Sequence, residues 1–256
     1  MITIPLAAMI TAFLTAGVRL SGLMLFAPFF GSEVIPARIK ALLVIALSAL
    51  MFPAVNHQLQ LQPISSWPKM IVLEFLIGAG MGIAANLVFE AVQLSGQVLG
   101  IQMGYSLVTI LDPQTQANST VIALLYQSIV MLIFLRMDVQ YWLLRAVGNS
   151  FLYLPPGSAH IGGTFAAAVV WIVGRIFGLG VQIAAPVLAA TLAADIVLGL
   201  LGKASPQLPV MLLGPAIKSV LGLFTLAATL MYWPDLFRRL FLGSISTVDQ
   251  LFHLAY

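Results

Sequence analysis

Among the ionisable side chains inside long apolar runs of this chain, where a charge is costly and often functional, we single out five as candidates. They are Arg19, Glu74, Glu90, Arg175 and Asp195. Carboxylates in such positions could form a proton relay, but no two of these acids share one helical face at short spacing. Along a helix, Glu74 and Glu90 would lie about 24 Å apart, and Arg175 and Asp195 about 30 Å apart. Each must therefore reach another segment, another subunit or water, which favours buried structural pairs or ends of spans over a relay.

A stripe of small and amide residues follows in the third apolar run, within the sequence EAVQLSGQVLGIQMGY. Gln93, Gln97, Gly100 and Gly104 share one helical face, and Gly96 flanks it. Small residues at this spacing let two helix backbones approach closely, and glutamine side chains can hydrogen-bond across the contact. We therefore predict a tight helix–helix contact on this face, which we call the seam. The partner helix belongs to the same chain or to another subunit; alternatively, the face is a polar wall that lines a conduit.

The polar stretch LDPQTQANST, residues 111–120, separates two apolar runs near the middle of the chain. Asp112 and Pro113 are typical of a helix start. The aspartate side chain accepts hydrogen bonds from the free N–H groups of a first turn, and proline has no backbone N–H that would be left unpaired there. We expect the fourth helix to begin at 113 and the third to end near Gly104. The backbone between them either lies outside the lipid or lines water, since unpaired backbone is not tolerated in hydrocarbon.

The elements that position these residues must be membrane helices. Of 256 residues, 61% are hydrophobic and 7% are charged, whereas soluble domains carry about 25% charged residues. Six apolar segments, at about 5–30, 39–55, 69–104, 120–154, 164–201 and 207–237, predict an all-α membrane protein of about six long, kinked helices. The second is short for a span, the third and fifth are too long, and Pro186 predicts a kink in the fifth.

The chain lacks the features of most enzymes and metal proteins. It has no cysteine, and His57, His160 and His253 have no ligand spacing. No nucleotide-binding, metalloprotease or serine-hydrolase motif is present. Its eleven basic residues are scattered, which argues against nucleic acid as a partner. We therefore expect no enzymatic activity, no cofactor and no metal. With no charge before Arg19, the first run is expected to remain as a helix and not to be a cleaved signal.

Three motifs together resemble the flagellar export-gate FliR family and its virulence type III secretion counterparts. They are RLSGLMLFAPFFGSEVIPARIK (19–40), GQVLGIQMGYSLVTILDPQTQ (96–116) and LGKASPQLPVMLLGPAIKSVLGL (201–223). Their order and spacing extend the similarity over nearly the whole chain. The resemblance implies a FliP-like four-helix part at 1–158 and a FliQ-like helical hairpin with a tail at 159–256. The boundary agrees with the loop LPPGSAHIGG at 154–163.

The resemblance also implies a function. Such a chain is a single-copy subunit that joins FliP-like and FliQ-like subunits in the channel for unfolded export substrates, next to FlhB-like and FlhA-like subunits. The assembly lies in the bacterial inner membrane at the flagellar basal body, with much of it on the periplasmic side. The DPQTQ sequence is more similar to flagellar than to virulence members.

The polar stretch corresponds, by this resemblance, to a plug that closes the channel in its closed state. The plug residues so assigned are Tyr105, Ser106, Leu107, Val108, Thr109, Ile110, Leu111, Asp112, Pro113, Gln114, Thr115 and Gln116. A different class of function is a stand-alone proton-coupled transporter of small solutes that uses Glu74, Glu90 or Asp195. An inverted repeat, which such a transporter would have, is not evident. The chain could also be the equivalent virulence subunit, or a scaffold protein without contact to the lumen.

Overall fold

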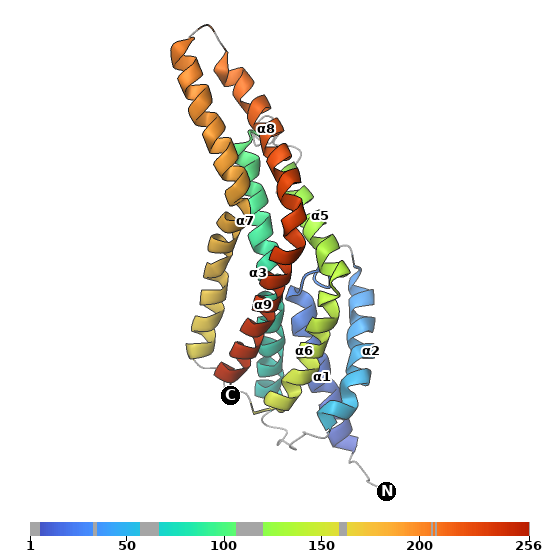
Figure 1. Cartoon of the computed structure of the whole chain (residues 1–256). Coiled ribbons are helices and arrows are strands. Elements are labelled where there is room, and N and C mark those ends of the chain that lie inside the picture. The colour runs from blue at the N-terminus through green and yellow to red at the C-terminus, as the bar shows by residue number, and fades with distance from the viewer. Residues whose placement is uncertain are drawn as a thin grey trace. The chain divides into compact units, whose positions relative to one another are not determined.

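Every element of the described structure is a helix (Figure 1). The computed structural model describes residues 6–32, 35–56, 67–105, 120–158, 163–205, 207 and 209–255. In chain order the elements are α1 (Leu6–Phe26), α2 (Ala37–Asn56), α3 (Trp67–Gln102), α5 (Val121–Arg136), α6 (Val139–Tyr153), α7 (Gly163–Ala204), α8 (Val210–Thr229), the 3-10 turn η3 (Leu230–Tyr232) and α9 (Trp233–Ala255). The predicted all-α membrane fold is confirmed.

The helices have the lengths that a membrane protein requires. Among the described residues, four helical stretches are long and apolar enough to cross a bilayer, or five if α5 and α6 count as one broken span. α3 has 36 residues and α7 has 42, more than the roughly 20 that a bilayer core needs. Pro186 lies inside α7, as predicted, and costs the helix one backbone donor.

Two predicted segment limits are wrong. The run expected over 120–154 is two helices, because Asp138 takes a left-handed conformation with φ of 56° between α5 and α6. The last run does not end at 237 but continues through η3 and α9 to Ala255. Composition missed both limits, since the break lies between two apolar helices and α9 is amphipathic.

The chain divides into two compact units, which we describe separately. The first comprises Met1–Leu87, Asp138–Val173 and Phe241–Tyr256, and the second comprises Val88–Met137 and Gly174–Leu240. Each unit draws on residues from both sides of position 158. The boundary at 158 that the resemblance implies stays a prediction.

The first unit packs α1 closely against α3. The close approach depends on glycines, because a Cβ added at Gly78 would overlap the carbonyl oxygen of Arg19. A Cβ at Gly82 would come within 2.8 Å of the carbonyl oxygen of Leu23. Two glycines four residues apart on one helix form the small-residue contact that membrane helices use. Between α1 and α2 the approach is looser, because a Cβ added at Gly17 would lie 3.3 Å from the Ser48 hydroxyl oxygen.

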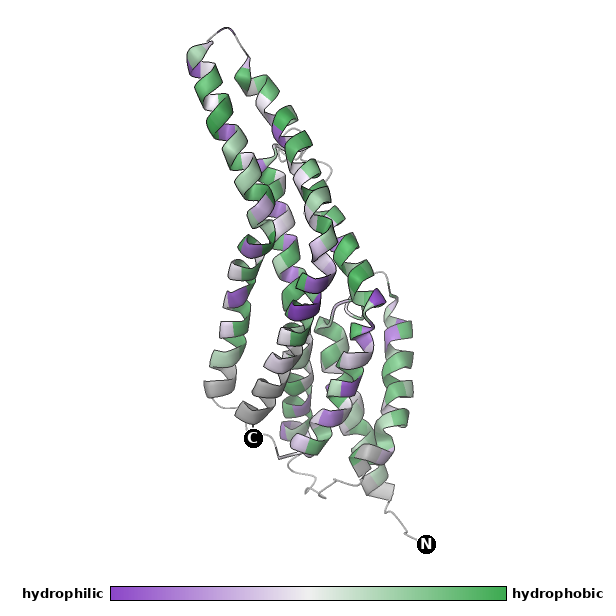
Figure 2. Cartoon of the chain, viewed as in Figure 1, coloured by the Kyte–Doolittle hydropathy of each residue, from purple (hydrophilic) through white to green (hydrophobic). Residues whose placement is uncertain are grey.

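The second unit contains an aromatic cluster and a helical hairpin. The rings of Tyr126 and Trp233 meet edge to face with centroids 4.8 Å apart, and Phe237 continues the cluster at 5.3 Å from Trp233. α7 and α8 run antiparallel on either side of the turn that includes Pro209 (Figure 1). Both helices carry apolar residues along most of their length (Figure 2), and many of these side chains are exposed.

Candidate functional site

The C-terminal end of α3 is closed by a glycine turn. Gly104 has a φ of 88°, in the left-handed region that glycine adopts without strain. The N–H of Tyr105 donates to the carbonyl of Gly100 at 2.8 Å, and the N–H of Gly104 donates to Ile101 at 3.1 Å. These two bonds form the Schellman motif that commonly ends helices. The predicted end of the third helix near Gly104 is confirmed.

The start of α5 is seated on the last turns of α3. Thr120 is the N-cap of α5, and its side-chain oxygen accepts from the N–H of Ala123 at 3.3 Å. The same hydroxyl donates to the carbonyl of Gly96 at 3.1 Å. A Cβ added at Gly100 would come within 2.6 Å of the Thr120 Cβ, and one at Gly96 would overlap the backbone of Ala123. The two glycines thus make room for the beginning of α5.

The helix start expected at Pro113 lies outside the described residues, and α5 begins later in the chain. Thr120 has an extended backbone, with φ −69° and ψ 153°, and α5 begins at the next residue. A threonine directly before the apolar run VIALL is itself a common N-cap signal. Asp112–Pro113 offered a competing signal earlier in the chain, and nothing in the local sequence ranks the two.

The α7–α8 hairpin holds the same end of α3 through polar contacts. Asp195 of α7 accepts from the Gln102 side-chain amide at 2.7 Å and pairs with Lys218 of α8 at 3.0 Å. Nearby, the Ser219 hydroxyl donates to the carbonyl of Met103 at 3.1 Å. We call Gln102, Asp195, Lys218 and Ser219 the α3 clasp. It ties three helices to the point where the chain leaves α3.

Close packing reinforces the α3 clasp. A Cβ added at Gly104 would come within 2.9 Å of the Pro215 Cβ, so α8 lies directly against the glycine turn. Gly222, two turns further along α8, is equally close to the Met103 side chain. A larger residue at Gly104 would meet the rigid Pro215 ring, whereas one at Gly222 would displace the flexible Met103 side chain.

The remaining predicted seam residues lie on α3 within the second unit. Gln93 accepts a hydrogen bond from the Gln127 side chain of α5 at 3.1 Å. Gln97 is half-buried one turn further along. Glu90 and Arg175 are exposed on α3 and α7, and each interacts with a neighbouring group. Of the predicted plug residues, Tyr105 is described and is half-buried, whereas 106–116 lie outside the described residues.

Arg19 and Glu74 meet in the core of the first unit. The Arg19 Nε and Nη2 atoms lie 2.7 and 2.6 Å from one carboxylate oxygen of Glu74, and both side chains are fully buried or nearly so. Arg19 also donates to the Ser150 hydroxyl at 2.8 Å and to the Leu154 carbonyl at 3.1 Å. The second Glu74 oxygen accepts from the N–H of Gly157 at 3.3 Å.

This arrangement has the geometry of a structural ion pair. The guanidinium also stacks 4.0 Å from the centre of the Phe151 ring. With both carboxylate oxygens accepting and the guanidinium bonded on three sides, the pair joins α1, α3 and the end of α6. Proton transfer would require breaking several charge-assisted bonds at once. Within the described ranges, no cluster of three or more metal-ligating side chains is present.

The sequence pointed to some of these residues and missed others. Ionisable residues in apolar runs identified Arg19, Glu74 and Asp195. Gln102, Lys218 and Ser219 were missed. An amide or a serine is ordinary in a membrane helix, and Lys218, although it is ionisable and lies inside the apolar run 207–237, was not among the five candidates. Gly78 and Gly82 were also missed, although the segment GAGMG, residues 78–82, carries the small-residue spacing in plain view.

Comparison with known proteins identifies relatives along nearly the whole chain. Residues 10–244 match the family model described as bacterial export proteins, family 1. The flagellar biosynthetic protein FliR of Pectobacterium carotovorum is 30% identical over 228 residues, covering 88% of this chain and 86% of the relative. FliR of Bacillus subtilis is 27% identical over 246 residues and 95% of each chain. The secretion system apparatus protein SsaT of Salmonella typhimurium is 27% identical over 168 residues, 65% of each chain.

Proposed function

The chain belongs to the bacterial export proteins, family 1, and we propose that it is a subunit of the flagellar type III protein export gate. It lies in the bacterial inner membrane, at the flagellar basal body, with much of the assembly on the periplasmic side. It joins FliP-like and FliQ-like subunits in a channel for unfolded substrates and meets FlhB-like and FlhA-like subunits. The names of its relatives and its apolar helices support this proposal. The subunit acts sterically and carries out no chemical reaction.

The observation that carries the proposal is the anchoring of the central stretch at both ends. Tyr105 leaves α3 through the Gly104 turn, and Thr120 returns to the same end of α3, on Gly96 and Gly100. The residues between them therefore begin and end at one place, which the α3 clasp holds. A plug that blocks a channel needs such a fixed base. In our proposal, residues 105–116 are that plug and the glycine–glutamine seam is its support.

The α7–α8 hairpin supports the division into two parts. In our proposal, 159–256 is the FliQ-like part and 1–158 is the FliP-like part with the plug. The long antiparallel helices α7 and α8, with many apolar side chains exposed, suit packing against similar hairpins of neighbouring subunits. The ionisable residues Glu90, Arg175 and Asp195 then serve in contacts within and between subunits and do not form a proton path.

A second candidate is the equivalent subunit of a virulence secretion system. The similarity to SsaT of Salmonella typhimurium favours it, but that similarity covers 65% of this chain. The FliR proteins of two distant bacteria match 88% and 95% of it. Complementation separates the two candidates: the chain should restore motility to a strain that lacks its flagellar subunit and should leave a virulence-system mutant unrescued.

The plug proposal is tested by deleting residues 106–116 from the chain in the assembled complex. The deletion should raise ion leakage across the inner membrane, because the channel loses its obstruction while the α3 clasp keeps the base intact. A matched control replaces the same residues by an equally long polar stretch of glycine and serine, which should leak to an intermediate degree. Unchanged leakage in a complex that still contains its partner subunits would reject the plug.

A further inference from the structure

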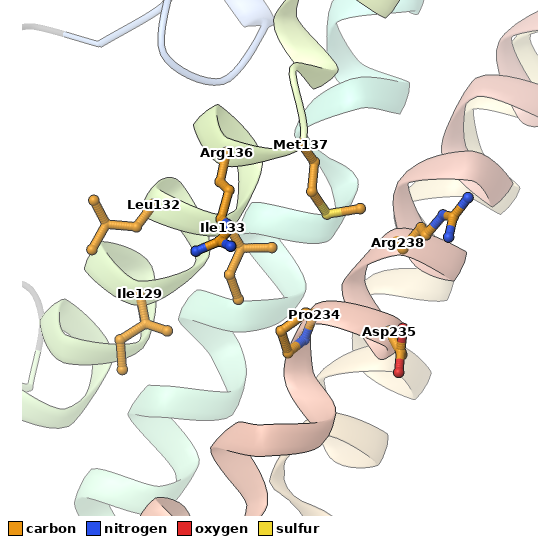
Figure 3. A pocket seen from close by; sticks show the side chains of 8 residues that line it. All are labelled: Ile129, Leu132, Ile133, Arg136, Met137, Pro234, Asp235 and Arg238. Atoms are coloured by element: carbon orange, nitrogen blue, oxygen red, sulfur yellow. The ribbon is translucent and has the colours of Figure 1, made fainter.

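A cavity of about 570 Å³ opens between the end of α5 and the start of α9, within the second unit. Figure 3 shows its lining, with Ile129, Leu132, Ile133, Arg136 and Met137 on the α5 side and Pro234, Asp235 and Arg238 on the α9 side. We call these eight residues the α5–α9 cavity. Its size falls in the range of about 300–1,000 Å³ that is typical of small-molecule sites. Neither the export function nor the plug uses it.

The walls of the α5–α9 cavity are aliphatic and flexible. Leu132, with 67% of its surface exposed, and the half-buried Ile129 and Ile133 form a stripe on α5. Met137 and Pro234 complete the walls. Aromatic side chains, which commonly anchor protein partners, are absent from this lining. A stripe of branched aliphatic residues along a helix suits the contact with a hydrocarbon chain.

Charged side chains line the cavity on both helices, and in Figure 3 the Arg136 guanidinium lies beside Ile133 whereas that of Arg238 points away from α5. Arg136 is in the last turn of α5. Asp235 is in the first turn of α9, and Arg238 follows in its second turn. Within the described part of the chain, none of these three side chains forms an ion pair or hydrogen bond. Helix dipoles account for Arg136 at a C-terminus and Asp235 at an N-terminus, but not for Arg238. The two guanidiniums and one carboxylate leave a net positive charge.

Along both helices, an apolar stretch leads into charged residues. On α5, Ile129 precedes Arg136 by seven residues, about 10 Å along the helix. The apolar stretch of α8 and η3 likewise leads into Asp235, Arg238 and Arg239, and Figure 2 shows this change from green to purple at the start of α9. At such a transition an arginine can lay its stem along hydrocarbon while its guanidinium reaches a phosphate group.

We propose that the α5–α9 cavity binds an anionic phospholipid. The phosphate lies between the two helices, where the guanidiniums of Arg136 and Arg238 can turn to it, because its oxygens match the forked guanidinium donors. One acyl chain lies along Leu132, Ile133 and Ile129. Asp235 opposes the headgroup charge and keeps the affinity moderate. The net positive charge selects an anionic lipid over a zwitterionic one, and the aliphatic walls select a lipid over a soluble phosphate.

The proposal is tested on the full-length chain purified in detergent. Native mass spectrometry would compare its binding of phosphatidylglycerol and of phosphatidylcholine with identical acyl chains. The natural chain should prefer phosphatidylglycerol. An arginine near an anionic headgroup accounts for about a fivefold change in affinity, so Arg136→Gln with Arg238→Gln should lose about 25-fold. Arg136→Lys with Arg238→Lys should retain most of the binding, and Asp235→Asn should strengthen it about fivefold.

Matched controls separate this site from general attraction to charge. Arg239→Gln removes a neighbouring arginine that does not line the cavity, and it should leave binding unchanged. Size-exclusion profiles identical to that of the natural chain would show that each variant is folded. Equal binding of both lipids, full binding by the double glutamine variant, or displacement of phosphatidylglycerol by an equal concentration of inorganic phosphate would overturn the proposal. So would a photo-cross-linker at Leu132 that captures a partner subunit in the assembled complex and no lipid.

Discussion

Arg19 and Glu74 form a buried ion pair in the first unit. Arg19 has no exposed surface, and its bonds to Glu74, Ser150 and the Leu154 carbonyl account for its polar atoms. Burial of such a pair costs desolvation energy that the mutual attraction roughly offsets. Loss of one partner leaves the other charge buried without compensation. The pair therefore specifies which faces of α1, α3 and α6 meet more than it adds net stability.

Single substitutions should reveal this asymmetry. We expect Glu74→Leu and Arg19→Leu each to lower the free energy of unfolding by about 3–5 kcal/mol, the usual cost of breaking a buried pair. The double variant should be less destabilised than the sum of the two, because no charge remains buried. The measurement is thermal or denaturant unfolding of the detergent-purified chain. Lys69→Gln, at an exposed position of α3, serves as the control and should change stability little. Additive single effects would show that the two residues do not act as a pair.

At the residue scale, the sequence indicated which side chains were unusual but not what they contact. Arg19 and Glu74 are 55 residues apart, and the sequence contains no periodic relation between α1 and α3 that would pair them. Gly104 was predictable, because a glycine that follows a long apolar run commonly ends a helix. The N-cap position of Thr120 had a local signal, but its bond to the Gly96 carbonyl did not, because Gly96 lies on another helix.

Glycines set how closely the helices approach. Gly78 and Gly148 differ in the space around them, and this difference can be tested. We expect Gly78→Ala to destabilise the chain, because the new methyl group would overlap the Arg19 carbonyl of α1. Gly148 of α6 faces open space within the chain, so Gly148→Ala should stabilise its helix by about 0.5–1 kcal/mol. Unfolding of the two purified variants, side by side, checks the signs. Equal effects would mean that the α1–α3 contact is looser than described.

The α3 clasp makes a prediction for the end of one helix. Asp195→Ala removes the hydrogen bond to Gln102 and the ion pair with Lys218. Because Asp195 is 41% exposed, we discount the loss to about 1 kcal/mol, or roughly fivefold faster amide exchange over residues 99–105. Hydrogen–deuterium exchange by mass spectrometry measures this. Asp235→Ala, which removes an exposed carboxylate outside the clasp, should leave the exchange of that peptide unchanged. Equal exchange in both variants would exclude the clasp.

At the element scale, apolar length predicted the existence of the helices, and local chemistry set their ends. α3 and α7 exceed the bilayer thickness, and both are continuous in the structure. The break at Asp138 could not be predicted from composition, because the apolar residues Met137 and Val139 flank it. The α3 clasp was equally hidden, since Gln102 and Asp195 meet only when the hairpin folds back on α3.

At the scale of the whole molecule, the apolar surface must be covered by something other than the chain itself. The apolar stretch of α7 is 28% buried within the chain and that of the last helices 17%, compared with 61% for α3. Lipid could cover these faces, and so could the hairpins of neighbouring subunits. The two solutions differ in the mass of the particle that detergent extracts, because lipid leaves a monomer and subunits leave a larger assembly.

We expect the chain to leave the membrane as part of a hetero-oligomer when FliP-like and FliQ-like subunits are co-expressed. Mass photometry or light scattering should then give a mass several times 27.4 kDa, with all three chains present. The chain expressed alone should lack this larger species, because its α7–α8 surface has no partner to pack against. Phe177 and Phe224 are 66% and 74% exposed. Replacing both by charged residues should abolish co-purification without unfolding the chain. As a control, the same change at the exposed Tyr141 of α6 should be tolerated. A monodisperse monomer that never binds either partner would favour the stand-alone transporter. The α3 clasp and the α5–α9 cavity would then be features of that transporter.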